Sequence, residues 1–464
     1  MVNSLLSCSV RGLLPLLLIF LGGLSVPAIA GNVILIIGDG MDDSQITIAR
    51  NYLVGSRSKL LVDKLPLRSA VQVLTVDEDN PQQPLYVADS ANSATSIATG
   101  AITSPGRIGT TAASDKDLIN LVELVKQHSI KVGLVTTASI TDATPASFYA
   151  HVNDRGCENP SAMVDFEKYA GLIVDCSQDL KANGGLGSIS EQLIISGVDV
   201  ALGGGMKHFT PDAEGSTLSV LALAKEAGYT VIENADQLAG NHGGKLLGLF
   251  SPSTMPVRWY GEDGRTAEKP KTSFMNLFHP MLGSVTYPEP MICEDNPDYA
   301  GMPSLASMSE VALAELTNDA QTPFFLMIES ASIDKQAHER KACGSIGELQ
   351  QLDEALAVAL KFADTNPDTL ILVTADHGHA AQILSERTIY DVLDLPIHSP
   401  GQVARITTPE GAVMTVNYAT NNFVSEEHTG VNVPLLSNSV GVGKIPGMIT
   451  QPEIFNIIKD YLID

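Results

Sequence analysis

The sequence predicts an α/β fold with a large, mostly parallel central sheet that is flanked by helices on both faces. Three short segments are almost entirely apolar, which is typical of strands buried on both faces of a parallel sheet: residues 33–37, 324–328 and 369–375. Each segment ends in acidic or histidine residues. Because ligands bind at the carboxyl ends of such strands, the sequence predicts a metal cluster at one edge of the sheet.

Helical patterns alternate with apolar strand patterns along the whole chain, as expected for one large α/β domain. In order, the sequence predicts strand 33–37, helix 42–54, helix 90–99, helix 117–128, strand 132–136, helix 187–197, strand 198–202, helix 218–228, strand 230–232, helix 308–316, strand 324–328, helix 347–362, strand 370–373 and helix 452–462. Two turn-rich stretches, 251–298 and 383–427, are interpreted as irregular insertions near the active-site edge or a subunit interface.

Residues 1–30 have the pattern of a signal peptide. Arg11 precedes the apolar run 13–21, and the segment closes with Ala28-Ile29-Ala30, a small-x-small cleavage pattern. The run is too short to be a transmembrane helix, and no later stretch approaches membrane-spanning length. We therefore expect a leader at 1–30 and a soluble, secreted domain at 31–464.

The composition is strongly acidic. Arg11 is the only charged residue of the leader, so its removal takes the formal net charge from −25 to −26. This charge argues against nucleic acid as a partner. An acidic surface can be a simple solvated surface or an adaptation to salty surroundings, and the sequence leaves both interpretations open.

Four cysteines remain after the leader and its Cys8 are removed. An even number in an exported chain suggests two disulfides. The sequence allows three pairings, of which the local, non-nested one joins Cys157 to Cys176 and Cys293 to Cys343. We favour that pairing.

The residues that follow the buried strands have metal-binding chemistry. Asp39 follows the first strand, and Asp376 and His377 follow the third. After the second strand come Glu329 and then Asp334 and His338, which are four apart and would share one face of a helical turn. Imidazole and carboxylate suit catalytic zinc, whereas carboxylate, hydroxyl and water suit magnesium. Taken alone, any one histidine is more often a hydrogen-bonded core residue.

Ser90 opens a run of small residues that can form a helix. A serine at a helix start faces free backbone N–H groups, which favour an anion such as phosphate. The plainer interpretation is a serine that only caps the helix. For an isolated Asp89-Ser90-Ala91 motif, the plainer interpretation is the usual one.

Six separated motifs and one arginine decide between these interpretations. They occur in this order: Gly38-Asp39-Gly40-Met41, Asp89-Ser90-Ala91, Thr141-Asp142-Ala143-Thr144-Pro145-Ala146, Arg155, Glu329-Ser330-Ala331-Ser332-Ile333-Asp334-Lys335-Gln336-Ala337-His338, Ala375-Asp376-His377-Gly378-His379 and Glu427-His428-Thr429-Gly430. Together they resemble the bacterial periplasmic alkaline phosphatases. The resemblance spans nearly all of the chain after the leader, and the positions of the four cysteines also resemble that family's two disulfides.

The resemblance implies a site with two Zn²⁺ and one Mg²⁺ per chain. The first zinc would be held by Asp334, His338 and His428, and the second by Asp39, Asp376 and His377. The magnesium would be held by Asp39, Thr144 and Glu329. His379 would contact the ligand Asp334 instead of a metal, and Asp142 and Lys335 would lie just outside the magnesium and the bound phosphate. The Asp and Lys form of this last pair favours magnesium.

The resemblance further implies hydrolysis of phosphate monoesters through a covalent phosphoserine on Ser90. Arg155 would clamp the phosphoryl oxygens, since a planar guanidinium can meet two oxygens at once. Under the plainer interpretation, Arg155 is only a surface arginine beside a disulfide. The family is homodimeric and periplasmic, so we expect an exported homodimer, periplasmic or extracellular, without a nucleic-acid or membrane partner.

Three alternatives remain in view. A phosphodiesterase of the same superfamily would usually carry a threonine nucleophile and lack an arginine like Arg155. A sulfatase would need a Cys or Ser within an arginine-containing motif, which does not follow Ser90. A non-catalytic metal- or phosphate-binding protein would need no nucleophile, so replacing Ser90 with Ala separates it from an enzyme.

Overall fold

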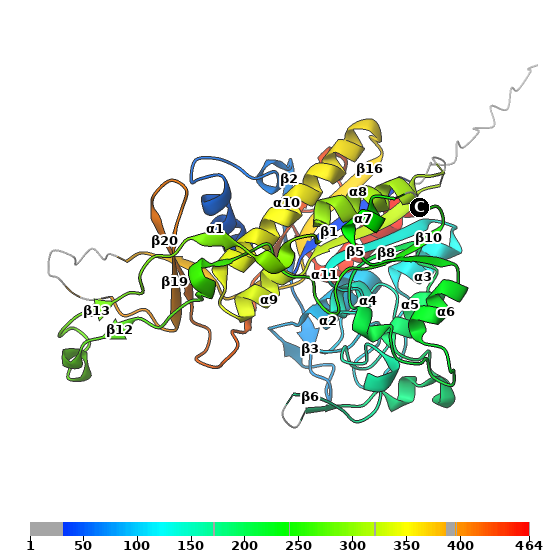
Figure 1. Ribbon diagram of the computed structural model, residues 1–464, viewed down its shortest axis with the longest axis horizontal. Helices are drawn as coiled ribbons and strands as arrows, with labels where there is room; N and C mark the ends of the chain where they lie inside the picture. Colours follow the sequence, from blue (N-terminus) through cyan, green and yellow to red (C-terminus); the bar gives the residue numbers. More distant parts are fainter. Residues whose placement is uncertain are drawn as a thin grey trace, which may run out of the picture.

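The computed structural model describes residues 31–169, 172–240, 242–319, 322–386, 395 and 397–463. The leader predicted at 1–30 lies outside these residues. A ten-stranded sheet crosses the centre of the described molecule in the order β23-β2-β22-β16-β1-β15-β5-β8-β10-β9 (Figure 1). Its strands are β1 (Asn32–Gly38), β2 (Leu67–Gln72), β5 (Lys131–Ser139), β8 (Val200–Gly204), β9 (Tyr229–Ile232), β10 (Lys245–Leu249), β15 (Phe324–Ser330), β16 (Thr369–Ala375), β22 (Val433–Ser437) and β23 (Met448–Thr450).

The central sheet is mostly parallel, as the sequence predicts. Strand β1 lies between β15 and β16 and runs parallel to both. Strand β22 runs antiparallel to its neighbours β16 and β2. All seven residues of β15 and of β16 are buried, which explains why both strands are mostly apolar; the carboxylate of Glu329 near the end of β15 is an exception.

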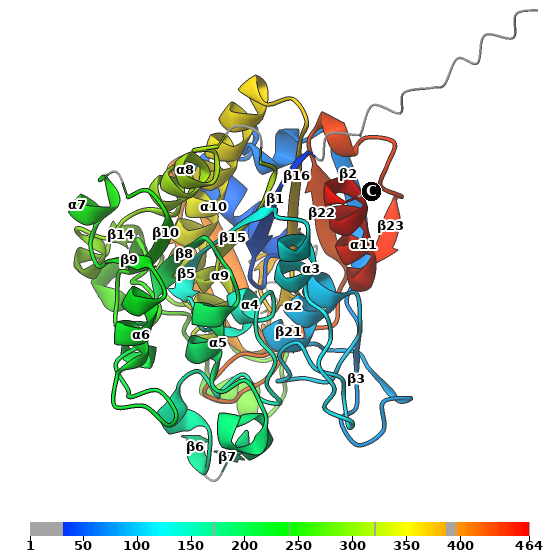
Figure 2. The same ribbon diagram turned by 90° about the vertical axis from the view of Figure 1, so that its right-hand side faces the viewer.

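Helices pack on both faces of the sheet. Figure 2 shows α8 and α10 on one side and α3 and α11 on the other. The described α-helices are α1 (Asp43–Leu53), α2 (Ser90–Thr99), α3 (Leu121–Gln127), α4 (Ala143–Ala146), α5 (Ile189–Ile195), α6 (Val220–Glu226), α7 (Ala235–Leu238), α8 (Leu305–Leu316), α9 (Ser332–His338), α10 (Ala342–Thr365) and α11 (Gln451–Leu462). Among them, none combines the length and apolar character that a membrane crossing needs.

Several helices differ from the prediction at their ends, and α3 and α10 differ most. Helix α3 begins at Leu121 because Asn120 caps it, with the Asn120 side chain accepting from the Glu123 N–H and Glu123 reaching back to the Asn120 N–H. Helix α10 begins at Ala342, five residues before the predicted start. Gly344 lies in this first turn. A glycine fits there because a β-carbon would lie 2.1 Å from the Gln336 side chain on α9.

The interpretation of 383–427 as irregular is wrong for much of that stretch. It contains a three-stranded antiparallel sheet in the order β18-β20-β19. These strands are β18 (Gln382–Leu384), β19 (Gln402–Thr407) and β20 (Val413–Tyr418). The turn residues that suggested irregularity join β19 to β20, where the Gly411 N–H donates to the Thr408 carbonyl.

Small two-stranded pairs account for most of the remaining strands. They are β3 (Thr75–Val76) with β4 (Pro84–Leu85), β6 (Phe166–Tyr169) with β7 (Leu172–Val174), β11 (Trp259–Gly261) with β14 (Cys293–Asp295), β12 (Lys271–Thr272) with β13 (Val285–Thr286), and β17 (Gly378–His379) with β21 (His428–Thr429). The last pair matters for the site, because it brings His428 beside His379 from a distant part of the chain.

Both disulfides of the favoured pairing are present. Cys157 bonds to Cys176, and Cys293 bonds to Cys343. The first lies two residues after Arg155. The second ties β14 to the first turn of α10.

Candidate active site

Three adjacent strands deliver the acidic cluster to one edge of the sheet. In the register of β1, Ile37 pairs with Glu329 on β15 and Gly38 pairs with Ala375 on β16. Asp39 and Asp376 are the next residues of their strands, so they emerge side by side. Gly40 follows with a φ of +68°, and a β-carbon there would lie 3.0 Å from Asp334. Only glycine fits this turn without strain.

Asp334, His338 and His428 converge on one point. Asp334 and His338 lie on α9, with His338 Nε2 3.3 Å from Asp334 Oδ2. His428 comes from β21 and places its Nε2 3.3 Å from Asp334 Oδ1 and 3.0 Å from His338 Nε2. These are the residues that the resemblance assigns to the first zinc.

The backbone fixes which ring nitrogens face this point. His338 Nδ1 is hydrogen-bonded to the Glu426 carbonyl, and His428 Nδ1 lies 2.8 Å from the Ala88 carbonyl. A carbonyl can only accept, so each Nδ1 carries a proton, and each Nε2 presents a lone pair toward this point once it has lost its own proton. Two lone pairs and a carboxylate that meet at hydrogen-bond distance form a site for a cation.

Asp39, Asp376 and His377 form a second group next to the first. His377 Nε2 lies 3.4 Å from Asp39 Oδ1 and 3.5 Å from Asp376 Oδ2. All three side chains are almost fully buried. Asp376 is also held by the Gly40 N–H, which donates to its Oδ1 at 3.0 Å. Asp334 lies between the two groups, because it also comes close to Asp39 and His377.

A third group contains oxygen atoms only. Glu329, at the end of β15, accepts hydrogen bonds from the Thr136 hydroxyl at 2.5 Å and from Thr144 on α4. Burial raises the pKa of Glu329 to about 7 although both hydroxyls oppose this change. Carboxylate and hydroxyl oxygens are the donors that magnesium prefers.

Ser90 points into the same cluster from the first residue of α2. Its Oγ lies 3.2 Å from His377 Nε2 and 3.5 Å from Asp39 Oδ1. The helix start is fixed by Asp89, whose side chain accepts from the Asn92 N–H while the Asn92 side chain accepts from the Asp89 N–H. The cap is therefore Asp89, and the Ser90 hydroxyl is left to face the acidic and imidazole groups.

Arg155 lies between two carboxylates, one of which belongs to Asp89, the residue before Ser90. Its Nη1 is 3.3 Å from Asp89 Oδ2, and its Nη2 is 3.1 Å from Asp142 Oδ1. Lys335 Nζ meets the other Asp142 oxygen at 2.6 Å. Burial alone would raise the pKa of Asp142, but the charges of Lys335 and Arg155 outweigh it and hold that pKa well below the ordinary value. Asp142 therefore holds both cations in place as a carboxylate.

The histidines of the cluster differ in charge. Burial lowers the pKa of His377 to about 3, so its ring is neutral and can act as a ligand. Burial, opposed by Asp334, also lowers the pKa of His379 to about 3. Burial alone would lower the pKa of His428, but Asp334 outweighs it and raises that pKa to about 9. A cation near His428 would replace this proton.

The donor set fits metal ions. Asp334 Oδ1, Asp376 Oδ2 and His379 Nε2 are buried and make no hydrogen bond of regular geometry among the described residues, only contacts of 3.3–3.5 Å within the cluster. Buried polar atoms without a partner are costly, and here they all lie in one acidic cluster. Within the described part of the chain, two sets of side chains are spaced to hold a metal, namely Asp334, His338, His379 and His428, and Asp39, Asp334 and His377. His379 Nε2 lies 3.4 Å from Asp334 Oδ1. At this distance His379 can either hold Asp334 in position or belong to the first metal-binding set itself.

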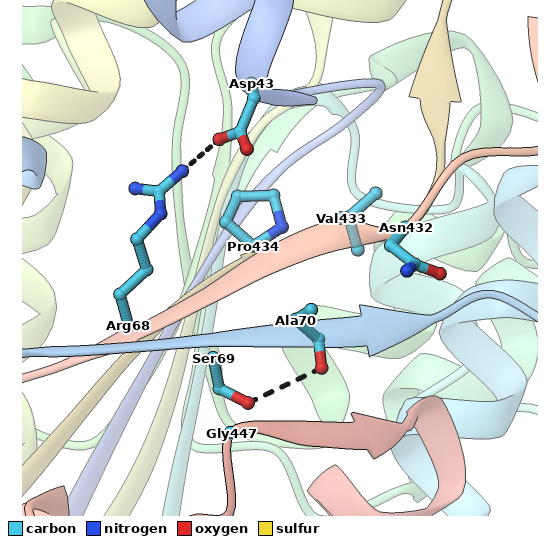
Figure 3. A pocket seen from close by; sticks show the side chains of 8 residues that line it. All are labelled: Asp43, Arg68, Ser69, Ala70, Asn432, Val433, Pro434 and Gly447. Atoms are coloured by element: carbon cyan, nitrogen blue, oxygen red, sulfur yellow. Dashed lines mark hydrogen bonds and ion pairs between the residues drawn. The ribbon is translucent and has the colours of Figure 1, made fainter.

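A surface pocket elsewhere does not compete with this site. Figure 3 shows a pocket of about 260 Å³ lined by Asp43, Arg68, Ser69, Ala70, Asn432, Val433, Pro434 and Gly447. Arg68 and Asp43, which carry its charges, are paired with each other. The lining offers no histidine and a single carboxylate, so it has no metal-binding set, and the hydroxyl of Ser69 donates to the Pro446 carbonyl at 2.6 Å.

Sequence reasoning gave no role to several residues that shape the site. Asp89 both caps α2 and pairs with Arg155. Its capping role could have been predicted from Asn92, because a polar residue three positions after the cap is typical of a capping box. Thr136 bonds Glu329 from the middle of an apolar strand, where the sequence shows no sign of it. Glu426 is completely buried, although nothing in the sequence distinguishes it from its exposed neighbour Glu427.

The comparisons with known proteins agree with the geometry. The alkaline phosphatase family model matches residues 30–431. The chain is 38% identical to alkaline phosphatase H of Pseudomonas aeruginosa over 441 residues, which is 93% of this chain and 84% of that protein. It is 37% identical to the alkaline phosphatase of Escherichia coli over 93% of this chain and 85% of that one. It is also 38% identical to the streptomycin-6-phosphate phosphatase of Streptomyces griseus over 94% of this chain and 91% of that protein.

Solved structures show the same fold at lower identity. The alkaline phosphatase of the Antarctic bacterium TAB5 matches with a TM-score of 0.62 at 23% identity, covering 93% of this chain and 97% of that one. The cold-active alkaline phosphatase of a Shewanella species matches with a TM-score of 0.65 at 19% identity, covering 93% and 100%. Because the family model covers most of the chain and several relatives exceed 30% identity over nine tenths of it, this chain belongs to the alkaline phosphatase family.

Proposed function

We propose that the protein is a metal-dependent phosphomonoesterase that works through a phosphoserine on Ser90. The observation that carries this proposal is the position of the Ser90 hydroxyl, 3.2 Å from His377 Nε2 in a buried cluster of carboxylates and imidazoles. A hydroxyl in such surroundings is an activated nucleophile once metals are bound. A protein that only stored metal or phosphate would gain nothing from a serine at this point.

The proposed metals are two zinc ions and one magnesium ion. Asp334, His338 and His428 would hold the first zinc, whereas Asp39, Asp376 and His377 would hold the second. Asp39, Thr144 and Glu329 would hold magnesium, with Thr136 fixing the Glu329 carboxylate. When bound, the ions would lower the pKa of the reacting hydroxyls and neutralise charge on the phosphoryl oxygens.

The chemical step follows from the remaining groups. A bond forms between Ser90 Oγ and phosphorus as the ester P–O bond breaks, and the alcohol leaves with a proton. Water then attacks phosphorus, releasing inorganic phosphate and restoring the Ser90 hydroxyl. Arg155 would bind two phosphoryl oxygens, since Asp89 and Asp142 already hold its guanidinium in one orientation.

The proposed substrates are phosphate monoesters as a class. One relative is named for a phosphorylated antibiotic and others simply as alkaline phosphatases. What such esters share is the phosphoryl group, which is also what Ser90 and Arg155 would contact. The structure gives no reason to narrow the choice of alcohol.

We further propose that residues 1–30 are a signal peptide, that 31–464 form the catalytic domain, and that the enzyme works as an exported homodimer in the periplasm. The leader pattern and the two disulfides support export, because disulfides persist in oxidising compartments.

The first test replaces Ser90 with Ala and uses p-nitrophenyl phosphate as substrate. The variant should retain zinc and magnesium but lose turnover by at least about 10³-fold, as expected for loss of a covalent nucleophile. Ser93→Ala is the matched control, because Ser93 is a buried serine on the same helix. An acid quench of the wild-type enzyme with excess phosphate should place phosphate on the Ser90 peptide. Phosphate found only on another peptide would rule out this mechanism.

The second test removes the metals. Chelation should abolish activity, and zinc with magnesium should restore it, with about two zinc and one magnesium per chain by metal analysis. Full activity in metal-free protein would contradict the proposal. A different metal ratio with restored activity would change only the assignment of the ions.

A further inference from the structure

Residues 269–288 form a hairpin that projects from the body of the molecule. In Figure 1 this segment, here called the apolar arm, extends to the far left, with β12 (Lys271–Thr272) and β13 (Val285–Thr286) along it. A short 3₁₀ helix (Phe274–Leu277) forms its tip. The arm is not part of the catalytic cluster, and no role described above uses it.

The tip of the arm exposes an unusual amount of apolar surface. Phe274 is 71% exposed, Leu277 76% and Phe278 69%. Met275, Met281 and Leu282 are each about half exposed. Single exposed apolar residues are normal on a protein surface, but a contiguous group of large ones marks an interaction site.

The tip is held together by its own polar contacts. Ser273 and Asn276 form a capping box, and the Asn276 side chain donates to the Leu282 carbonyl at 2.7 Å. The Phe274 and Phe278 rings pack edge to face with centroids 5.4 Å apart. Ser273 and Asn276 thus spend their polar groups on the backbone of the tip, while its large apolar side chains stay exposed.

The arm also differs from the rest of the chain in charge. Its charged side chains are Lys269 and Lys271, both exposed, and it has no Asp or Glu. The whole chain has a formal charge of −25, so everything outside the arm carries −27. An apolar tip with a basic stem is therefore complementary to the acidic body of another molecule of this protein.

We propose that the apolar arm docks on a second copy of this chain and is needed for dimer formation. This inference rests on the proposed homodimer and locates part of its contact surface. Two acidic bodies repel each other, so association needs an element that is itself not acidic. The arm meets this need, and its projection lets it reach beyond the acidic surface from which it arises.

The test compares two arm variants with matched controls by sedimentation velocity across a range of protein concentrations. Leu277→Ser with Phe278→Ser removes the apolar tip, and Lys269→Glu with Lys271→Glu reverses the stem charge. Ile119→Ser with Ile195→Ser is the control for the tip, because both isoleucines are more than 60% exposed elsewhere. Lys116→Glu with Lys225→Glu is the control for the charge.

The arm variants should weaken the dimer by at least about a hundredfold, as expected for losing two large apolar contacts or two charge contacts, while the controls stay within about threefold of wild type. Metal content and melting temperature should stay unchanged, because the substituted side chains are exposed. Arm variants that dimerise like wild type would overturn the proposal and leave the homodimer standing. A monomeric wild type would overturn both, without touching the proposed phosphatase activity. Binding of the wild type to phosphatidylcholine vesicles, lost in the tip variant with the dimer intact, would assign the arm to a membrane instead.

Discussion

Arg340 and Glu426 form a buried ion pair next to His338, one of the residues proposed to hold the first zinc. Arg340 Nε lies 2.8 Å from Glu426 Oε2, and the two side chains are 4% and 0% exposed. The Glu426 carbonyl accepts from His338 Nδ1, so the residue that binds Arg340 also orients a proposed zinc ligand. Arg340 has a φ of +58°, a conformation that is costly for a non-glycine residue and needs such contacts to persist.

Glu426→Gln should therefore weaken zinc binding. The substitution leaves Arg340 without its charge partner in a buried place, which costs about 3 kcal/mol, and loosens the segment whose Glu426 carbonyl orients His338. We expect about 10- to 100-fold lower affinity for the first zinc, measured by competition with a chelator, together with a lower melting temperature. Glu427→Gln is the control, because Glu427 is exposed and adjacent. Equal zinc affinity in the two variants would show that the pair only supports the fold.

The strand ends were predictable because burial leaves a strong signal. The segment 369–375 consists of the residues of β16, and the acidic residues that follow β1, β15 and β16 meet where parallel strands must end together. The contribution of Glu426 was not predictable. In an extended segment alternate side chains point to opposite sides, and sequence alone does not say whether Glu426 or Glu427 faces inward.

Asp142 should control how tightly the enzyme holds phosphate. It binds Lys335 at 2.6 Å and Arg155 at 3.1 Å, so its charge offsets both cations near the proposed phosphate position. Asp142→Asn should free that positive charge and lower the inhibition constant of phosphate by about tenfold, equivalent to about 1.4 kcal/mol. Lys335→Met should raise the same constant. Steady-state inhibition by phosphate measures both, and changes in the same direction would contradict this division of roles.

The two disulfides should differ in what they support. Cys157 lies two residues after Arg155, so replacing Cys157 and Cys176 with Ala should loosen the arginine and raise KM. Cys293 and Cys343 are 50 residues apart and fasten β14 to α10. Replacing them with Ala should lower stability by up to about 4 kcal/mol, the chain-entropy figure for a loop of that length, and leave KM nearly unchanged. Each pair is the control for the other, with melting temperature and KM measured on both. A KM effect confined to the second pair would refute the assignment.

Glu158 should make stability depend on pH. Its Oε2 lies 3.1 Å from His208 Nε2, and it also accepts from the Thr141 hydroxyl at 2.7 Å. Burial, followed by the charge of Asp142, raises the pKa of Glu158 to about 7. Burial and then the charge of Lys207 lower the pKa of His208 to about 4. Near neutral pH a protonated Glu158 can therefore donate to a neutral His208.

The direction of the pH effect follows from these values. An unfolded glutamate loses its proton near pH 4.3, whereas folded Glu158 keeps it until about pH 7. Between these values folding must hold a proton that the unfolded chain releases, so the wild type loses stability as pH rises through this window and then levels off. Glu158→Gln donates to His208 without titrating. About a quarter of the Glu158 side chain is exposed, which reduces the effect through solvent screening to about 1 kcal/mol.

Melting temperatures of the metal-loaded wild type and of Glu158→Gln, measured from pH 5 to pH 8, test this. The variant should gain about 1–2 °C over the wild type by pH 8, and the gap should grow mainly between pH 5 and pH 7. Glu226→Gln is the control for removing one exposed acidic side chain elsewhere. A gap that shrinks as pH rises would mean that Glu158 is held as a carboxylate, with His208 carrying the proton. Glu158 and His208 would then form a charged pair. Because Glu158 lies near Asp142, that pair would extend the ionic network around Arg155 and Lys335.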